Sequence, residues 1–132
     1  MSISKYLLIF FVSLVIFLVV DGIWLGFIAK NMYSQKIGHL LSDKPNLFAA
    51  GVFYLIFIIG LTAIVTIPSL RSNSFASALL LGGLFGLVSY STYDLTNLAT
   101  LKNWPLDVTI IDMIWGTFVS SLVSSITFLI FK

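Results

Sequence analysis

The sequence predicts an all-α integral membrane protein, an antiparallel bundle of four transmembrane helices. Hydrophobic residues make up 59% of the 132 residues, only 9% are charged, and the mean hydropathy is +1.10. A water-soluble domain of this size cannot bury so much apolar surface, so the surrounding solvent must be lipid. Four apolar segments have about the 20 residues that cross a hydrocarbon core. They are, approximately, residues 6–29, 46–67, 75–98 and 106–131.

The individual segments read as spans joined by short connections. Residues 6–29 are too long for a signal-peptide core, and no small-residue cleavage site follows them, so we expect a retained span. Pro105 stands where a helix-starting proline belongs, and Asp107 favours the positive end of the helix that begins there. The connections leave no room for a separate soluble domain. Residues 1–132 are therefore expected to form a single transmembrane domain.

Composition also excludes several kinds of site. The chain has no cysteine, which rules out disulfides, thiolate metal ligands and cysteine nucleophiles. No phosphate-binding loop, hydrolase motif or cofactor motif is evident, and the net charge of +2 predicts no nucleic-acid partner. Membrane lipids are the expected surroundings, with a homo-oligomer or a larger membrane protein left open as a partner. Basic residues divide four to three between the two sides, so the positive-inside rule decides no orientation.

Three of the five acidic residues, Asp21, Asp94 and Asp112, lie inside the apolar segments. Asp21 and Asp94 are near the C-terminal ends of the first and third spans, and Asp112 is near the N-terminal end of the fourth. Because successive spans alternate in direction, all three are expected at the same side of the bundle. An ionised carboxylate inside a membrane costs about 2.5–3.5 kcal/mol on insertion scales, and neighbouring carboxylates repel. With no Lys or Arg in the spans, the cluster must hold protons, bind a cation or open to water.

Small residues at four-residue steps predict that the third and fourth spans pack closely together. These helix-packing residues are Ala78, Gly82 and Gly86 in the third span and Gly116, Ser120 and Ser124 in the fourth. Antiparallel packing of the two ridges would bring Asp94 close to Asp112. The stretches DGIWLG and DMIWG both place an Asp and a Trp three residues apart, on one helical face. This echo indicates either a duplicated two-helix unit or a coincidence.

The candidate residues for binding a proton, a cation or another ligand are the three aspartates and the polar or aromatic residues expected near them. The set is Asp21, Asp94, Asp112, Asn97, Trp24, Trp115, Tyr90, Tyr93, Thr96 and His39. Several of these side chains can donate hydrogen bonds to carboxylate oxygens. A divalent cation held by the three aspartates is the one metal site, and the one cofactor, that the sequence leaves open. No catalytic residue can be assigned.

Ordinary structural roles are alternatives for several of these residues. The aspartates could cross-link helices, as polar side chains do inside membrane bundles. Tyr33 and Trp104 are expected in an interfacial aromatic belt, and His39 in a solvated loop between the first two spans.

Three stretches of the chain also carry a family resemblance. They are FLVVDGIWLGFIAKNMY, PNLFAAGVFYLIFIIGL and YDLTNLATLKNWPLDVTIIDMIWG. With them, nearly the whole chain resembles a family of small bacterial membrane proteins known as domain of unknown function 2177. The family's motif residues fall here on Asp21, Trp24, Gly26, Tyr33, Tyr54, Tyr93, Asp94, Thr96, Asn97, Trp104, Pro105, Asp112, Trp115 and Gly116. The resemblance implies a multi-pass protein of the bacterial inner membrane and supplies no activity.

Three functions remain open at this point. The first is a small transporter or channel subunit in which the aspartate cluster binds a proton or cation. The second is an intramembrane enzyme that acts on a lipid, with paired carboxylates as general acid and base or as metal ligands. The third is a non-catalytic partner subunit whose polar cluster specifies helix packing. We expect the first, because intramembrane acids commonly mark ion and solute pathways.

Overall fold

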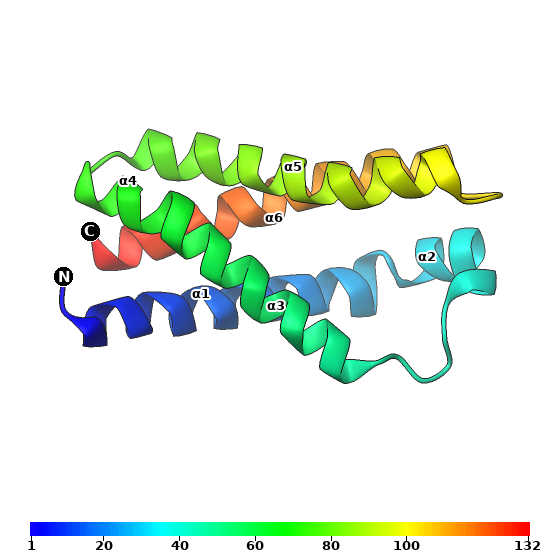
Figure 1. The fold of residues 1–132 in the computed structure, drawn as a ribbon, viewed down its shortest axis with the longest axis horizontal. Coiled ribbons are helices and arrows are strands. Elements are labelled where there is room, and N and C mark those ends of the chain that lie inside the picture. Colours follow the sequence, from blue (N-terminus) through cyan, green and yellow to red (C-terminus); the bar gives the residue numbers. More distant parts are fainter.

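The computed structural model describes residues 1–132 and contains helices and no strand. Four helical segments are long and apolar enough to cross a membrane: Ile3–Ile28, Leu47–Arg71, Phe75–Thr100 and Leu106–Phe131. Successive segments run in opposite directions, and the N- and C-termini lie at the same end of the bundle (Figure 1). The structure thus confirms the predicted antiparallel bundle of four membrane-spanning helices.

The first span consists of α1 (Ile3–Ile23) and a π-helical turn, η1 (Trp24–Ile28). Ser2 caps α1 by accepting a hydrogen bond from the backbone N–H of Lys5. In η1 the Ala29 N–H donates to the Trp24 carbonyl oxygen at 2.8 Å, one residue further back than in an α-helix. Such π-turns occur frequently at functional sites, and this one directly follows the turn that carries Asp21.

The connection after the first span is a helix, although the sequence predicted a loop. It contains α2 (Lys30–Ile37) and a short 3-10 turn, η2 (Gly38–Leu40). Ile37 packs with Trp104 and Val108, and the half-buried Tyr33, one helical turn before Ile37, packs against this small core. These contacts hold α2 against the start of α6 (Leu106–Phe131). Trp104 is therefore only 8% exposed and lies inside the protein rather than in an aromatic belt.

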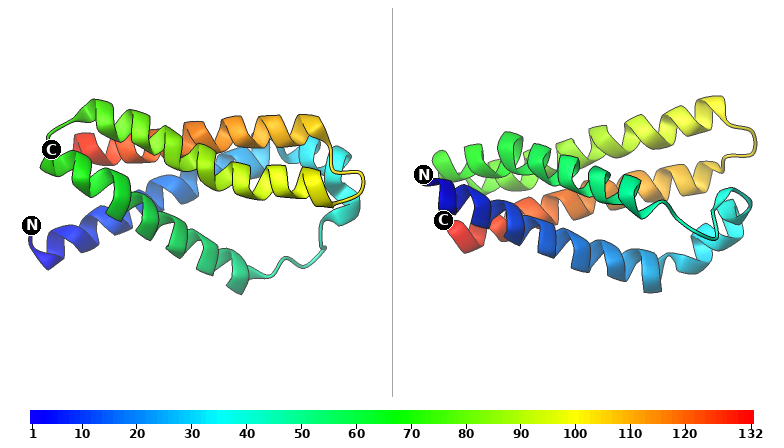
Figure 2. Two further views of the ribbon diagram at one scale, coloured as in Figure 1. Left: turned by 45° about the horizontal axis from the view of Figure 1, so that its top comes forward. Right: turned by 60° about the horizontal axis from the view of Figure 1, so that its bottom comes forward.

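The second span is made of α3 (Leu47–Leu61), a π-turn η3 (Thr62–Thr66) and α4 (Ile67–Arg71). Pro68 accounts for η3, because proline has no N–H to donate to the carbonyl four residues earlier. α3 crosses the bundle obliquely, and its N-terminal half diverges from the other helices (Figures 1 and 2). A groove of about 520 Å³ between α1 and α3 is lined by apolar residues and Tyr54.

α5 (Phe75–Thr100) and α6 make the most extensive contact between helices and run side by side in all views (Figures 1 and 2). A Cβ atom at Gly86 would overlap the carbonyl oxygen of Gly116, and one at Gly116 would overlap the ring of Tyr90. Ser124 donates a hydrogen bond of 2.7 Å to the Ala78 carbonyl oxygen across the same contact. Buried along it are all the small residues of the two ridges: Ala78, Gly82, Gly86, Gly116, Ser120 and Ser124.

The main hydrophobic core joins the first, second and fourth spans. Its buried members are Phe17, Phe57, Ile58, Leu61, Val65, Val119 and Val123. Phe17 lies one helical turn before Asp21, and Val119 lies one turn after Trp115. The core therefore ends where the polar residues begin. Its side chains pack directly beneath the candidate site, on the side nearer the two chain termini.

Candidate functional site

The three intramembrane aspartates line two adjoining cavities at the end of the bundle that α2 covers. The α2 cavity, about 360 Å³, has Tyr33, Ile37, Tyr93, Asp94, Trp104 and Asp112 among its walls. The aromatic cavity, about 400 Å³, has Asp21, Trp24, Tyr54, Tyr90, Asp112 and Trp115 among its walls. Four residues line both cavities: Leu25, Tyr33, Tyr93 and Asp112. They therefore connect the two halves of the site.

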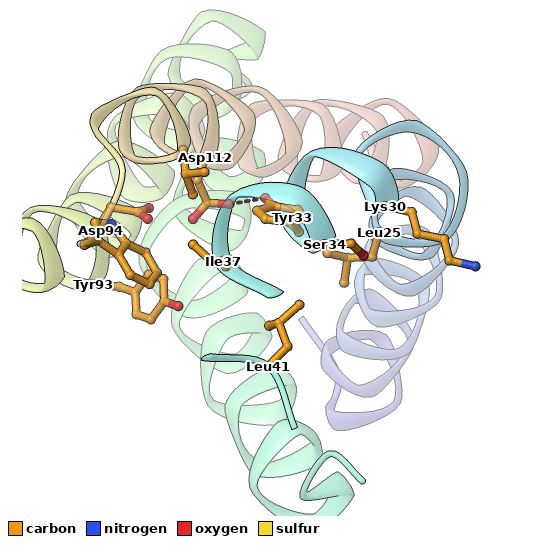
Figure 3. A pocket seen from close by; sticks show the side chains of 11 residues that line it. Leu25, Lys30, Tyr33, Ser34, Ile37, Leu41, Tyr93, Asp94 and Asp112 are labelled. Carbon is orange, nitrogen blue, oxygen red and sulfur yellow. Dashed lines mark hydrogen bonds between the residues drawn. The ribbon is translucent and has the colours of Figure 1, made fainter. Parts of the chain in front are cut away.

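Asp112 is held by a chain of hydrogen bonds that begins at Trp24. The Tyr33 hydroxyl donates to Oδ1 of Asp112 at 2.6 Å (Figure 3), and the Trp24 indole N–H donates to the Tyr33 oxygen at 3.1 Å. Burial of Tyr33, and then its hydrogen bond to the Asp112 carboxylate, raise the pKa of the Tyr33 hydroxyl above its ordinary value. Tyr33 is therefore a neutral donor across the physiological pH range.

Asp21 has its own pair of donors. It is 7% exposed, and its Oδ1 accepts a hydrogen bond from the Trp115 indole N–H at 3.1 Å. Its Oδ2 accepts one from the Tyr54 hydroxyl at 3.2 Å. Both oxygens are thus satisfied by neutral aromatic side chains, as a buried carboxylate requires.

The two Asp–Trp pairs of the sequence interlock in the structure. Trp115 comes from the same helix as Asp112 but donates to Asp21, whereas Trp24 comes from the same span as Asp21 but donates to Tyr33, the partner of Asp112. The two indole rings stack with their centroids 4.3 Å apart and their planes 5° from parallel. The repeated Asp-x-x-Trp spacing therefore corresponds to two antiparallel spans, the first and the fourth, in which the tryptophan of each span serves the aspartate of the other, Trp115 directly and Trp24 through Tyr33.

Asp94 differs from the other two aspartates. It is fully buried (0% exposed), and neither of its oxygens has a hydrogen-bond partner. Its carboxyl group faces that of Asp112 (Figure 3). Lys30 borders the same cavity, but its ammonium group points away from both carboxyl groups (Figure 3). Two carboxyl groups that face each other here repel when both are ionised, which favours a shared proton or a cation between them.

Of the candidates predicted from sequence, seven line the two cavities and three do not. Those that line a cavity are Asp21, Trp24, Tyr90, Tyr93, Asp94, Asp112 and Trp115. Thr96 points to another side of α5, because it is two residues from Asp94, and its hydroxyl donates to the Thr92 carbonyl of its own helix. Asn97 is half-buried outside both cavities, and His39 is exposed in η2.

The residues alone do not predict Tyr33 or Tyr54 at the site, and only the family resemblance singles them out as motif residues. Tyr33, expected in an aromatic belt, instead donates to Asp112, and Tyr54 donates to Asp21. A signal for Tyr54 is its isolation as the one hydroxyl in the apolar stretch AAGVFYLIFIIGL. For Tyr33 the signal is its position one helical turn before Ile37, which gives α2 an inward face.

The three aspartates do not converge on one metal position. No three His, Asp or Glu side chains lie close enough together to hold a metal ion. Asp21 is occupied by Tyr54 and Trp115, while Asp94 and Asp112 face each other. The geometry therefore favours a ligand between Asp94 and Asp112 over a divalent ion shared by all three.

Replacing Tyr33 by phenylalanine is expected to lower the free energy of unfolding by about 1–3 kcal/mol, because Asp112 loses its only protein donor. The substitution should also change the alkaline pH dependence. Because the pKa of Tyr33 is raised in the native state, the unfolded chain loses this proton first as the pH rises above about 10. The stability of the wild-type protein should then fall more steeply above that pH than the stability of the variant.

The measurement is denaturant unfolding of both proteins in detergent micelles, followed by circular dichroism at neutral and alkaline pH. Equal stability at neutral pH together with parallel alkaline curves would contradict the assigned role of Tyr33.

Comparison with known proteins places the chain in a family. No curated protein and no solved structure matches it. The family model described as predicted membrane protein (DUF2177) matches residues 6–129. The matched region includes the three aspartates and the aromatic residues that donate to Asp21 and Asp112. The chain therefore belongs to the DUF2177 family of predicted membrane proteins, and its four spans make it a multi-pass one.

Proposed function

We propose that this protein is a small membrane transporter or channel subunit that binds a proton or a small monovalent cation between Asp94 and Asp112. The observation that carries the proposal is Asp94, a fully buried carboxyl group with no hydrogen-bond partner on either oxygen. Such a group is costly to keep in an apolar bundle, and buried ionisable groups inside spans usually mark a pathway for protons or ions.

The surroundings of the pair support exchange of the bound cation with solution. The α2 cavity lies at the end of the bundle, and its volume of about 360 Å³ is large enough to hold water beside the half-buried Asp112, with Asp94 in its wall. Asp112 has one oxygen engaged by Tyr33, while Asp94 has none engaged. The ligand would therefore complete the coordination of Asp94 without displacing a protein donor.

Binding at this pair can also be coupled to movement. Tyr33 belongs to α2, and its hydrogen bond to Asp112 is one of the contacts that hold α2 against α6. A change in charge between Asp94 and Asp112 alters the strength of that hydrogen bond. Occupancy of the pair would thus bias the position of α2, which covers the cavity.

The test is direct binding by the purified protein. A proton held at the pair would give a protonated-carboxyl infrared band near neutral pH, and this band should disappear in Asp94→Asn. If no such band is present, titration with Na⁺ or K⁺ should reveal saturable binding that the same substitution abolishes. Asp43→Asn is the matched control, because Asp43 is exposed in the connection before α3. Absence of both signals in the folded wild-type protein would exclude the proposal.

A further inference from the structure

We propose that the aromatic cavity binds an organic ammonium ion, whose positive charge is held among aromatic rings beside Asp21 and Asp112. The inference rests on the proposed function, because it names the class of solute whose binding would be coupled to the Asp94–Asp112 pair. It concerns the second cavity, which shares Asp112 with the first but which Asp21, Trp24 and Trp115 line alone, so substitutions and signals at these residues test it separately.

The walls of the aromatic cavity have the composition of a cation site. Two tryptophans, four tyrosines and Phe53 are among its 11 lining residues, together with Asp21 and Asp112 and no basic residue. Aromatic faces attract cations through their quadrupoles, and this attraction grows when the cation is removed from water. The volume of about 400 Å³ is in the range of cavities that enclose small organic molecules.

The hydrogen bonds within the cavity favour ammonium groups that carry few N–H donors over ligands that must donate several hydrogen bonds. Both oxygens of Asp21 already accept hydrogen bonds from Trp115 and Tyr54, and neither donor carries a charge. Asp21 thus has no positively charged side chain as a partner, although its hydrogen-bonding capacity is largely used. A ligand that brings a diffuse positive charge and few N–H groups satisfies this carboxylate, and it needs only contact with the rings for the rest of its affinity.

The aromatic cavity adjoins, at Tyr54, an apolar groove that could hold a chain attached to the ammonium group. Tyr54 lines both the aromatic cavity and the groove of about 520 Å³ between α1 and α3. The remaining residues of that groove are apolar apart from Gly51. The same ammonium chemistry can therefore come from a free small cation or from the headgroup of an amphiphile, and the experiment has to separate these sources.

The experiment follows the tryptophan fluorescence of the full-length protein in nanodiscs. The nanodiscs are made of anionic lipid alone, so that no lipid headgroup brings an ammonium group of its own. The titrants are choline, its uncharged isostere 3,3-dimethylbutan-1-ol, and dodecyltrimethylammonium. Trp24 and Trp115 stack in the cavity wall, so an occupant should change their emission saturably. We expect a saturable change with the ammonium compounds and none with the uncharged alcohol. Saturation by choline identifies a free cation, whereas saturation by the long-chain compound alone identifies an amphiphile.

Substitutions at Asp21 and Tyr93 test the two parts of the site. Asp21→Asn should weaken ammonium binding about tenfold or more through loss of the charge. Tyr93 lines this cavity as well as the α2 cavity, is 54% exposed, and makes no side-chain hydrogen bond to another helix. Tyr93→Leu should therefore remain folded and bind about tenfold more weakly, whereas Tyr93→Phe should bind like the wild type. Asp43→Asn is the control outside both cavities.

Two results would overturn the inference: no saturable response to either ammonium compound, or equal binding of the uncharged isostere. The infrared and cation-binding signals of Asp94 would be unaffected by that failure, so the proposed function would survive it. The opposite result is ammonium binding without any infrared or cation-binding signal from Asp94. It would support ammonium binding in the aromatic cavity and contradict its coupling to the Asp94–Asp112 pair.

Discussion

Replacing Gly86 by leucine is expected to separate α5 from α6 and to lower the free energy of unfolding by about 3 kcal/mol or more. Even the first carbon of the new side chain would overlap the Gly116 carbonyl oxygen and the side chain of Ser120. The obstructing carbonyl belongs to a helix backbone and cannot rotate away. The helices must therefore move apart along the whole contact, which includes the Ser124–Ala78 hydrogen bond.

The measurement is unfolding in mixed micelles, followed by helical circular dichroism, for the wild type, Gly86→Leu and Gly51→Leu. Gly51 also lies in a membrane-spanning helix, but a Cβ atom there would meet nothing within 4 Å. The control should therefore lose little stability. A similar loss in both variants would mean that leucine affects the helices by itself, and that the close approach of α5 and α6 is not what stabilises the bundle.

The pairing of Asp94 with Asp112 could be predicted because the evidence for it lies along two helices. Gly82 and Gly86 on one span, and Gly116 on the other, define the contact faces and the direction of packing. Once α5 and α6 are packed antiparallel through these residues, the positions of the two aspartates follow. The bounds of the spans could also be predicted, because a long apolar run is recognised from local composition and needs no knowledge of tertiary contacts.

The position of Asp21 could not be derived in the same way. α1 is apolar on all sides, so its sequence does not reveal which face turns toward α6 and which toward lipid. The rotation of α1 is set by contacts with other helices, including the hydrogen bonds from Trp115 and Tyr54 to Asp21. The three aspartates consequently share one end of the bundle without sharing one ligand position.

The helical structure of α2 and the role of Tyr33 could not be predicted for another reason. The segment KNMYSQKI is polar enough to be read as a loop, and its inward face consists mainly of Tyr33 and Ile37. Its helix becomes evident only with Trp104 and Val108 in place, about 70 residues later in the chain. Sequence reasoning therefore identified the carboxylates and missed the tyrosine that holds one of them.

The structure also separates two roles that the sequence assigned to all three aspartates together. Asp21 and Asp112 have protein donors and help to join helices, as polar cross-links do. Asp94 has no such donor, and its carboxyl group faces only the carboxyl group of Asp112. A carboxyl group that receives no hydrogen bond from the fold, yet bears the cost of burial, is expected to be retained for binding.

Replacing Asp94 by leucine is therefore expected to raise the free energy of unfolding by about 1–3 kcal/mol, because the cost of burying an unpartnered polar group disappears. Asp21→Leu should have the opposite sign, because it leaves the Trp115 and Tyr54 donors without an acceptor. Unfolding of the three proteins in the same micelles measures the signs directly. If leucine destabilises both positions alike, Asp94 is a structural cross-link and the protein is better regarded as an assembly partner. If the signs differ and Asp94→Leu also loses its cation or proton, stability and binding oppose each other at this residue, as they do in sites kept for function.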